Sequence, residues 1–281
     1  MPITRPDHAD CRPRPRPIGR GCEASKNGPR LPLTLETQMV QNIYDNPEFF
    51  AGYSQLPRQV GGLDHAPEWP AIRAMLPGLS GARVADLGCG FGWASRWFRA
   101  QGAASVLGLD LSQNMIDRAR ADTHDRAITY RIADLDALDL PSEAFDLVYS
   151  ALTFHYVPDF ARLIRVIHAA LVPGGDMVFT IEHPIFMAAR HPQWIEDEDG
   201  TKTWPVNGYS REGERRTDWF AKGVLKHHRT LATTINTLIG AGFALRRLEE
   251  FAPTAAQIAA MPALEEELER PMMALIAAQK V

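Results

Sequence analysis

Short apolar runs alternate with longer stretches whose apolar residues fall on one helical face. The runs at 84–87, 104–110, 128–132, 145–150 and 177–182 are typical of buried strands. Helices are predicted between them, one following Ser112 as its N-cap to about residue 121 and one over 159–171. Further helices are predicted at 64–75 and 228–241, and a turn at 171–175. Regular alternation of strand and helix predicts an α/β fold, a parallel sheet with helices on both faces.

The first strand runs into the sequence VADLGCGFG at 84–92, where Gly88, Gly90 and Gly92 occupy alternate positions. This spacing suits a turn at which backbone closely approaches a nucleotide-like ligand. The dinucleotide fingerprint G-x-G-x-x-G is not met, because Trp93 follows Gly92 and the third glycine comes one residue early. Asp86 would repel a pyrophosphate and suits a positively charged group. A glycine turn of purely structural meaning is the alternative.

The second strand ends at Asp110, about twenty residues beyond the glycines, the spacing at which a carboxylate binds ribose hydroxyls. Leu111, just before the N-cap Ser112, and Met115, on the helix that follows, are placed to cover one face of a flat ring.

The order of these segments resembles that of the class I S-adenosylmethionine-dependent methyltransferases, over roughly residues 44–281. The matching stretches are VADLGCGFG, GLDLS, ADLDALDLP, FDLVYSALTFHYV and LVPGG. The resemblance implies S-adenosylmethionine as cofactor, S-adenosylhomocysteine as product and no metal. By position it implies that the methionine part is held by Asp86, Gly88 and Gly90, the ribose by Asp110, the adenine edge by Asp134 and the backbone of Leu135, and the region near the sulfonium by Ser150.

The same resemblance implies a Rossmann-like, seven-stranded, mostly parallel sheet whose last strand runs antiparallel. Residues 272–279, after Pro271, suit that strand at an edge of the sheet. An N-terminal lid is expected at about 39–60 and a cap inserted after the fifth strand at about 183–226. Both segments are rich in aromatic residues, which suit either an acceptor pocket or simple packing. The candidate acceptor-binding residues are Tyr44, His183, Trp194 and Trp219.

Methyl transfer from a sulfonium requires an aligned nucleophile, exclusion of water and, for some acceptors, removal of a proton. The candidate catalytic residues are Tyr53 in the lid and His155 and Glu182 at strand ends. Together with the aromatic segments they indicate a small aromatic or heterocyclic acceptor. The chain is also similar to bacterial small-molecule methyltransferases of specialised metabolism, including indole C3-methyltransferases, in which a base takes the indole N–H proton. The alternatives are O- or N-methylation of another small metabolite, a nicotinamide-dependent oxidoreductase and a non-catalytic cofactor-binding protein.

Composition limits the remaining choices. With 281 residues, 45% of them hydrophobic, the chain suits one large α/β domain at 37–281. A net charge of −4 disfavours a nucleic-acid partner, and no apolar stretch predicts a membrane span. Cys11, Cys22 and Cys89 have no metal or redox spacing, which favours the cytoplasm. Residues 1–36, rich in Arg and Pro, predict a disordered tail, with Met39 as an alternative start; a monomer and a homodimer are both open.

Overall fold

The computed structural model describes residues 42–281, so the predicted tail, Met39, Cys11 and Cys22 lie outside the described residues. Its α-helices in that range are α1 Pro47–Tyr53, α2 Pro57–Gly61, α3 Trp69–Met75, α4 Trp93–Ala100, α5 Gln113–Ala121, α6 Phe160–Ala170, α7 Pro184–Ala188, α8 Leu231–Gly240 and α9 Ala255–Ala260. Its 3-10 helices are η1 Ile43–Asp45, η2 Leu63–His65, η3 Phe154–Tyr156 and η4 Pro262–Leu268. Its strands are β1 Arg83–Leu87, β2 Ser105–Asp110, β3 Ile128–Ile132, β4 Phe145–Ala151, β5 Leu171–Glu182, β6 Ile195–Glu196, β7 Lys202–Thr203, β8 Gly213–Trp219, β9 Ala221–His228, β10 Phe243–Glu250 and β11 Met273–Lys280.

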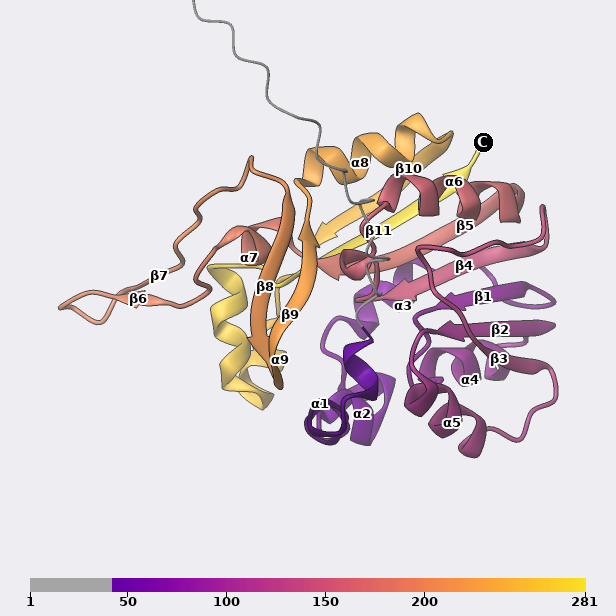
Figure 1. Ribbon diagram of the computed structural model, residues 1–281, viewed down its shortest axis with the longest axis horizontal. Coiled ribbons are helices and arrows are strands. Elements are labelled where there is room, and N and C mark those ends of the chain that lie inside the picture. The colour runs from indigo at the N-terminus through magenta and orange to yellow at the C-terminus, as the bar shows by residue number, and fades with distance from the viewer. Residues whose placement is uncertain (1–41) are drawn as a thin grey trace, which may run out of the picture. The chain divides into compact units, whose positions relative to one another are not determined.

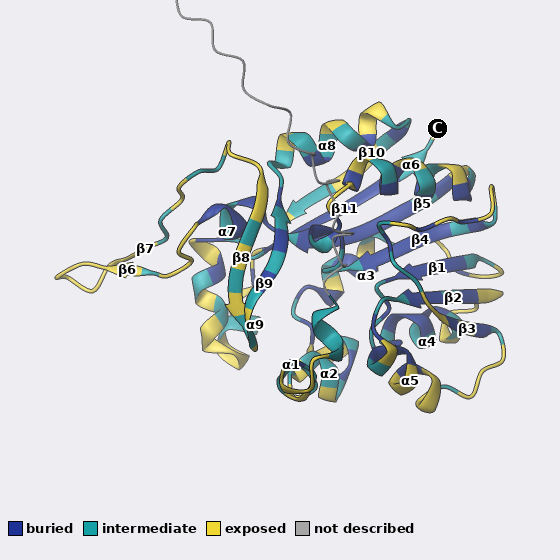
Figure 2. Ribbon diagram, in the orientation of Figure 1, coloured by how far each residue is buried: buried dark blue, intermediate teal, exposed yellow. Residues whose placement is uncertain are grey.

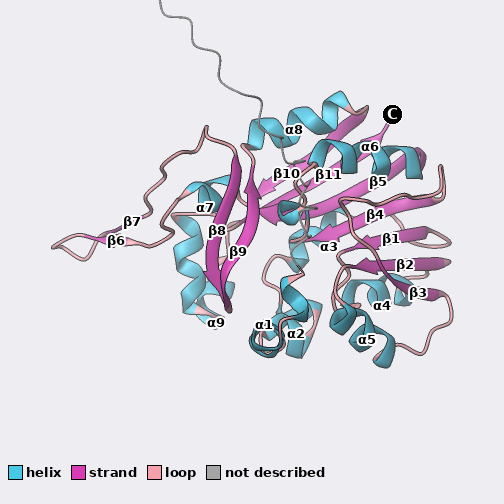
Figure 3. Ribbon diagram, viewed as in Figure 1, coloured by secondary structure: helices cyan, strands magenta, loops and turns pink. Residues whose placement is uncertain are grey.

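One seven-stranded sheet organises residues 42–281, with the strand order β10-β11-β5-β4-β1-β2-β3 (Figures 1 and 3). β1 pairs in parallel with both β2 and β4, whereas β11 is antiparallel to β5 and to β10. The predicted α/β fold, a seven-stranded mostly parallel sheet with an antiparallel last strand, is therefore confirmed. β1 lies in the interior of the sheet, so the turn that follows it opens among the ends of neighbouring strands.

The central strands are largely buried (Figure 2). Their alternate residues belong to two separate hydrophobic clusters, one on each face of the sheet. Ala85 and Leu87 face the cluster covered by α6 and α8, whereas Val84 faces the one covered by α3, α4 and α5. Phe98 on α4 and Ile167 on α6 are each 0% exposed. Helices thus cover both faces, and this packing holds the ends of β1, β2, β4 and β5 in fixed positions.

Two expectations about strands were wrong. The turn predicted at 171–175 is the beginning of β5, because Leu171 already pairs with Phe145 and a bulge at Phe145/Leu147 absorbs the irregular residues. Residues 272–279 form a strand, but not at an edge, since β10 lies outside β11. The continuous apolar run of β11 is typical of a strand buried on both faces. β10 was not predicted from the sequence. It carries charged side chains, as is typical of an exposed edge strand.

Two predicted helices are shorter than expected. The segment 64–75 divides into η2 and α3, since Pro70 occupies the first turn of a new helix. The helix predicted at 228–241 begins at Leu231, where the Thr230 hydroxyl accepts a hydrogen bond from Thr233 N at 3.1 Å. His228, placed on that helix by the sequence, is the last residue of β9 and is 0% exposed.

Two segments lie beside the carboxyl ends of the parallel strands. Residues 42–61, here called the lid, contain η1, α1 and α2. Residues 183–228, here called the cap, contain α7 and two antiparallel hairpins, β6–β7 and β8–β9, of which β8–β9 lies near the end of β5 (Figure 1). No helix within residues 42–281 is long and apolar enough to cross a membrane.

Candidate active site

The turn after β1 combines close packing with open space. Gly88 has φ +74°, and a Cβ there would lie 2.1 Å from the Thr153 hydroxyl oxygen, so only glycine fits. Gly90 has φ +52°, and a Cβ there would meet no atom within 4 Å. Gly88 therefore lets the turn pack against the segment after β4, whereas Gly90 leaves a space that a ligand can enter closely.

Two carboxylates border this turn. Asp86 is 1% exposed and accepts a 2.6 Å hydrogen bond from the Ser95 hydroxyl on α4; burial raises its pKa to about 7. Asp110, at the end of β2, accepts hydrogen bonds from Gly90 N at 2.9 Å and from Ser112 N at 3.0 Å. Burial raises the pKa of Asp110 as well. The structure thus brings Asp110 to the glycine turn, as its spacing predicts.

The lid is fastened to α5 directly beyond Asp110. Asp45 accepts hydrogen bonds from the Ser112 hydroxyl at 2.5 Å, Asn114 N at 3.1 Å and Gln113 N at 3.2 Å. These bonds lower the pKa of Asp45, and they satisfy amide groups at the N-terminus of α5. Asp45 was not predicted from the sequence, because the helix start that it binds lies 67 to 69 positions away.

The other predicted cofactor residues lie near the same strand ends. Met115 is 1% and Leu135 is 7% exposed, and Asp134 accepts a 2.9 Å hydrogen bond from Asp136 N. Ser150 is 0% exposed and donates its hydroxyl hydrogen to Leu87 O at 2.7 Å, which ties β4 to β1. Leu111 accepts a 3.4 Å hydrogen bond at its carbonyl from the lid residue Asn42.

Aromatic side chains from the lid, the cap and η3 meet beside the carboxyl ends of the parallel strands. We call Tyr44, Phe49, Tyr53, Tyr156 and Trp219 the aromatic cluster. The ring centroid of Tyr44 lies 5.1 Å from that of Tyr53 and 6.0 Å from that of Tyr156, and Trp219 lies 5.4 Å from Phe49. The Tyr44 and Tyr156 hydroxyls are 3.2 Å apart. Burial raises the pKa of Tyr53 to about 12 and also raises that of Tyr44 well above its usual value, so both phenols are protonated near neutral pH.

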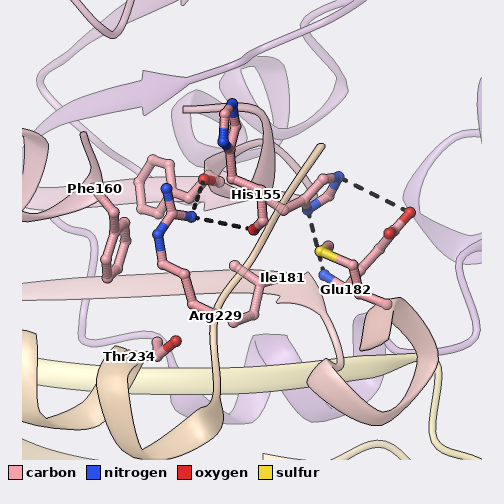
Figure 4. Close-up of a pocket in the computed structure, with 9 residues that line it drawn as sticks. His155, Phe160, Ile181, Glu182, Arg229 and Thr234 are labelled. Carbon is pink, nitrogen blue, oxygen red and sulfur yellow. Dashed lines mark hydrogen bonds and ion pairs between the residues drawn. The ribbon is translucent and has the colours of Figure 1, made fainter. Parts of the chain in front are cut away.

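The aromatic cluster adjoins three ionisable side chains, His155, Glu182 and Lys226, which we call the ionic group (Figure 4 shows the first two). The Lys226 ammonium forms an ion pair with Glu182 Oε1, and His155 Nε2 lies 4.0 Å from the same oxygen. Lys226 also lies over the Trp219 ring, 5.4 Å from its centroid, and the ring centroids of His155 and Tyr156 are 4.4 Å apart.

The hydrogen bonds of His155 define its protonation state. Its Nδ1 accepts a 3.3 Å hydrogen bond from Glu182 N, so in the neutral ring the proton is on Nε2, facing the Glu182 carboxylate. Burial, Lys226 and Arg229 hold the pKa of His155 well below its usual range. His155 is therefore neutral near pH 7, and its basic nitrogen is already bonded to the backbone.

Arg229, which follows β9, supports the segment that carries His155. Its guanidinium donates to Phe154 O at 3.4 Å (Figure 4). It also donates to Val157 O and, at 2.9 Å, to Pro158 O. Burial lowers the pKa of Arg229 to about 10, so it remains charged at neutral pH. With His155 and Glu182 it lines a cavity of about 20 Å³, room for about one water molecule.

Two of the predicted acceptor residues do not join the aromatic cluster. His183 is 1% exposed, and both its ring nitrogens are occupied, since Nδ1 caps α7 by accepting from Ile185 N and Nε2 lies 2.8 Å from Glu250. Trp194 packs in a second aromatic group within the cap, where the Arg270 guanidinium lies 5.2 Å from its ring centroid. Both side chains are therefore held by contacts outside the aromatic cluster. The aromatic residues of the cap divide between that cluster and the second group around Trp194.

Three further residues near the site, Tyr156, Lys226 and Arg229, were not predicted from the sequence. A signal for Lys226 was present, because it alternates along β9 with the buried residues Val224 and His228, the spacing of one strand face. Within residues 42–281, no group of three or more His, Cys, Asp or Glu side chains is arranged to hold a metal ion.

Comparison with known proteins places these features in context. A family model described as a methyltransferase domain matches residues 85–179. A crystal structure of an S-adenosylmethionine-dependent methyltransferase from Mesorhizobium loti is 58% identical, with a TM-score of 0.76, over 78% of this chain and all of that one. An uncharacterised protein of Haemophilus influenzae is 34% identical over 74% of this chain and 85% of its own length. A malonyl-[acyl-carrier protein] O-methyltransferase of Enterobacter lignolyticus is 39% identical over 39% of this chain, and the match spans less than half of that protein (43%).

Proposed function

Because the chain belongs to the class I S-adenosylmethionine-dependent methyltransferases, we propose that it methylates a small aromatic or heterocyclic acceptor bound between lid and cap. The observation that carries this proposal is the contact between the aromatic cluster and the ionic group through Trp219 and Lys226. Aromatic walls suit a flat, apolar acceptor, and charged groups at one side suit the handling of its proton.

The residues around the glycine turn fit S-adenosylmethionine. The open space at Gly90 accommodates a ligand in close contact with backbone, and Asp86 offers a carboxylate to the ammonium of its methionine part. Asp110 has lone pairs left for the ribose hydroxyls beyond its bonds to Gly90 and Ser112. When bound, the cofactor supplies a methyl group on a positively charged sulfur. The role of the lid is then to exclude water from that methyl group.

Among the three candidate catalytic residues, the contacts favour Glu182 as the base. Tyr53 has a pKa of about 12 and is not a proton acceptor at neutral pH. His155 has its basic nitrogen bonded to Glu182 N, which makes it a positioning residue that directs its Nε2–H toward the Glu182 carboxylate. Glu182 has its second oxygen, Oε2, available for an acceptor hydroxyl or N–H. The acceptor atom, indole C3 or an oxygen, stays a prediction. An oxygen acceptor is the one named for a relative, the malonyl-[acyl-carrier protein] O-methyltransferase.

The proposal is tested by calorimetric titration with S-adenosylmethionine, followed by incubation with panels of phenols, indoles, carboxylic acids and amines and mass spectrometry of the products. We expect cofactor binding and a methylated product from at least one aromatic panel. Cofactor binding without methylation of any aromatic compound, but with methylation of aliphatic ones, would contradict the aromatic acceptor. Absence of cofactor binding would contradict the whole assignment.

Cofactor affinity is expected to depend on pH through Asp86. With a pKa of about 7, Asp86 is protonated below neutral pH in the free protein, whereas pairing with an ammonium requires the carboxylate. Binding must then release a proton, so the affinity should fall by about tenfold per pH unit below pH 7 and level off above it. Titrations in two buffers of different ionisation enthalpy measure the released proton. In Asp86→Asn the affinity should be lower and nearly independent of pH; an unchanged pH profile would assign the proton to another group.

A further inference from the structure

Lys226 is a cation in an unusual place. Its side chain is 4% exposed, it projects from β9 toward the end of β5, and it contacts Glu182 and the face of Trp219. Burying an ammonium is costly unless opposite charge and hydrogen bonds compensate for the lost water. Glu182 supplies one such contact, and the ammonium has further N–H groups with which it can donate to a ligand.

Within residues 42–281, Lys226 has one partner of opposite charge within ion-pair distance, the Glu182 carboxylate. Lys226 and Arg229 both lower the pKa of the neighbouring His155. The Arg229 guanidinium donates to backbone carbonyls, and the charges of Glu212 and Asp159 act on it. His155 is neutral and adds no negative charge beside Lys226. An anionic oxygen of a ligand would therefore give the Lys226 ammonium a second partner of opposite charge.

We propose that the acceptor reacts as an oxyanion, a phenolate or a carboxylate, whose charged oxygen binds to the Lys226 ammonium beside Trp219. This inference rests on the proposed function and specifies its acceptor class. A phenol donates its hydroxyl proton to Glu182 Oε2, whereas a carboxylic acid arrives ionised. A lone pair of the acceptor oxygen forms the O–C bond to the methyl carbon as the C–S bond breaks, and the bonding electrons go to sulfur. The products are a neutral ether or ester and a neutral thioether.

Carbon and nitrogen acceptors fit this environment less well. Attack by indole C3 places positive charge on the ring, and methylation of an amine gives a cationic product. The Lys226 ammonium opposes both charges, because like charges in a region of low dielectric repel strongly. An oxyanion loses its charge in the reaction, and Lys226 stabilises it until the bond has formed.

The test compares Lys226→Met with Lys226→Arg and a matched control, Lys222→Met, which changes an exposed lysine near the start of the same strand. We expect Lys226→Met to lower kcat/KM for phenols or carboxylic acids by on the order of 10²–10³, as for loss of one oxyanion-stabilising group. Lys226→Arg should restore part of this loss, and Lys222→Met should have no effect. Thermal unfolding reports whether each variant is folded.

A second readout does not need turnover. 4-Nitrophenol changes colour on ionisation, so its absorbance in the presence of protein and S-adenosylhomocysteine reports the bound form. Wild type should bind the phenolate and lower the apparent pKa of the ligand, and Lys226→Met should lose this shift. If Lys226→Met does not fold, the wild-type spectrum still decides, because binding of the neutral phenol would overturn the inference.

Acceptor panels separate this inference from the proposed function. Products from phenols alone or from carboxylic acids alone identify the source of the oxyanion, and either supports Lys226 as its binding residue. Methylation of indole carbon or of amines, with oxygen acceptors left unmodified, would overturn the inference while the proposed function stands. Equal kcat/KM for oxygen acceptors in wild type and Lys226→Met would also overturn it.

Discussion

Asp110→Ala is expected to weaken S-adenosylmethionine binding by about 10²–10⁴-fold, the equivalent of two lost hydrogen bonds to a charged group at ~1.5–3 kcal/mol each. The carboxylate has two functions here. It holds the glycine turn through Gly90 N and the start of α5 through Ser112 N, and in our proposal it also accepts hydrogen bonds from the ribose. Its removal leaves the ribose hydroxyls without a charged acceptor. Calorimetric titration with S-adenosylmethionine and with S-adenosylhomocysteine measures the loss.

A matched control for Asp110→Ala is Asp117→Ala, which removes an exposed carboxylate from α5, the helix that begins beyond Asp110. It should bind the cofactor as wild type does. Asp110→Asn retains the shape of the side chain and one carbonyl acceptor. Its affinity for S-adenosylmethionine should lie between those of Asp110→Ala and Asp117→Ala. If Asp110→Ala remained folded and bound both ligands with wild-type affinity, Asp110 would be only a structural residue of the turn.

The cofactor side of the site was largely predictable from sequence, because it depends on local patterns. Asp86, the glycines and Asp110 lie within 25 positions of one another. Asp86 and the glycines belong to β1 and its turn, and Asp110 ends β2. The parallel register of these two strands brings Asp110 to Gly90. The seven-stranded sheet with an antiparallel last strand followed from the resemblance. The strand at the edge did not, because the charged residues of β10 conceal its strand pattern.

The acceptor side was predictable only in part. His155 and Glu182 were found because both follow parallel strands and so must lie at the same end of the sheet. Lys226 reaches Glu182 only because the β8–β9 hairpin folds over that end, a contact between residues 44 positions apart. The sequence did not distinguish the environments of Trp194 and Trp219, since both are tryptophans of the cap. The packing of Trp194 with Arg270, rather than its residue type, assigns it to another core.

The lid connects the two sides. Asp45 fastens it to α5 beside Asp110, and Tyr44, its neighbour in sequence, contacts Tyr53 and Tyr156 in the aromatic cluster. The lid therefore contacts the cofactor side and the acceptor side of the site together. In our proposal the acceptor depends on the same helix start that Asp110 organises, and Glu182 acts as the base in a site from which the lid excludes water.

Glu182→Gln is expected to lower kcat for a weakly acidic phenol by about 10²–10⁴-fold, the usual contribution of a general base. Glutamine keeps an oxygen that can accept from Lys226 but cannot take a proton. The KM should change much less, since aromatic contacts supply most of the binding. The matched control is Glu250→Gln, which neutralises a carboxylate paired with His183 near the same end of the sheet; its kcat should equal that of wild type.

The dependence on acceptor acidity separates a base from a structural carboxylate. An electron-poor phenol is already ionised at the assay pH and needs no base, so the defect of Glu182→Gln should shrink along a series of increasingly acidic phenols. A structural role would lower kcat by the same factor for every phenol, because a misplaced site affects all acceptors alike. His155→Gln should show the same trend at smaller amplitude, since His155 positions the carboxylate and does not itself take the proton. A constant defect across the series would therefore remove Glu182 as the base and leave Lys226 to act on an acceptor that ionises in solution.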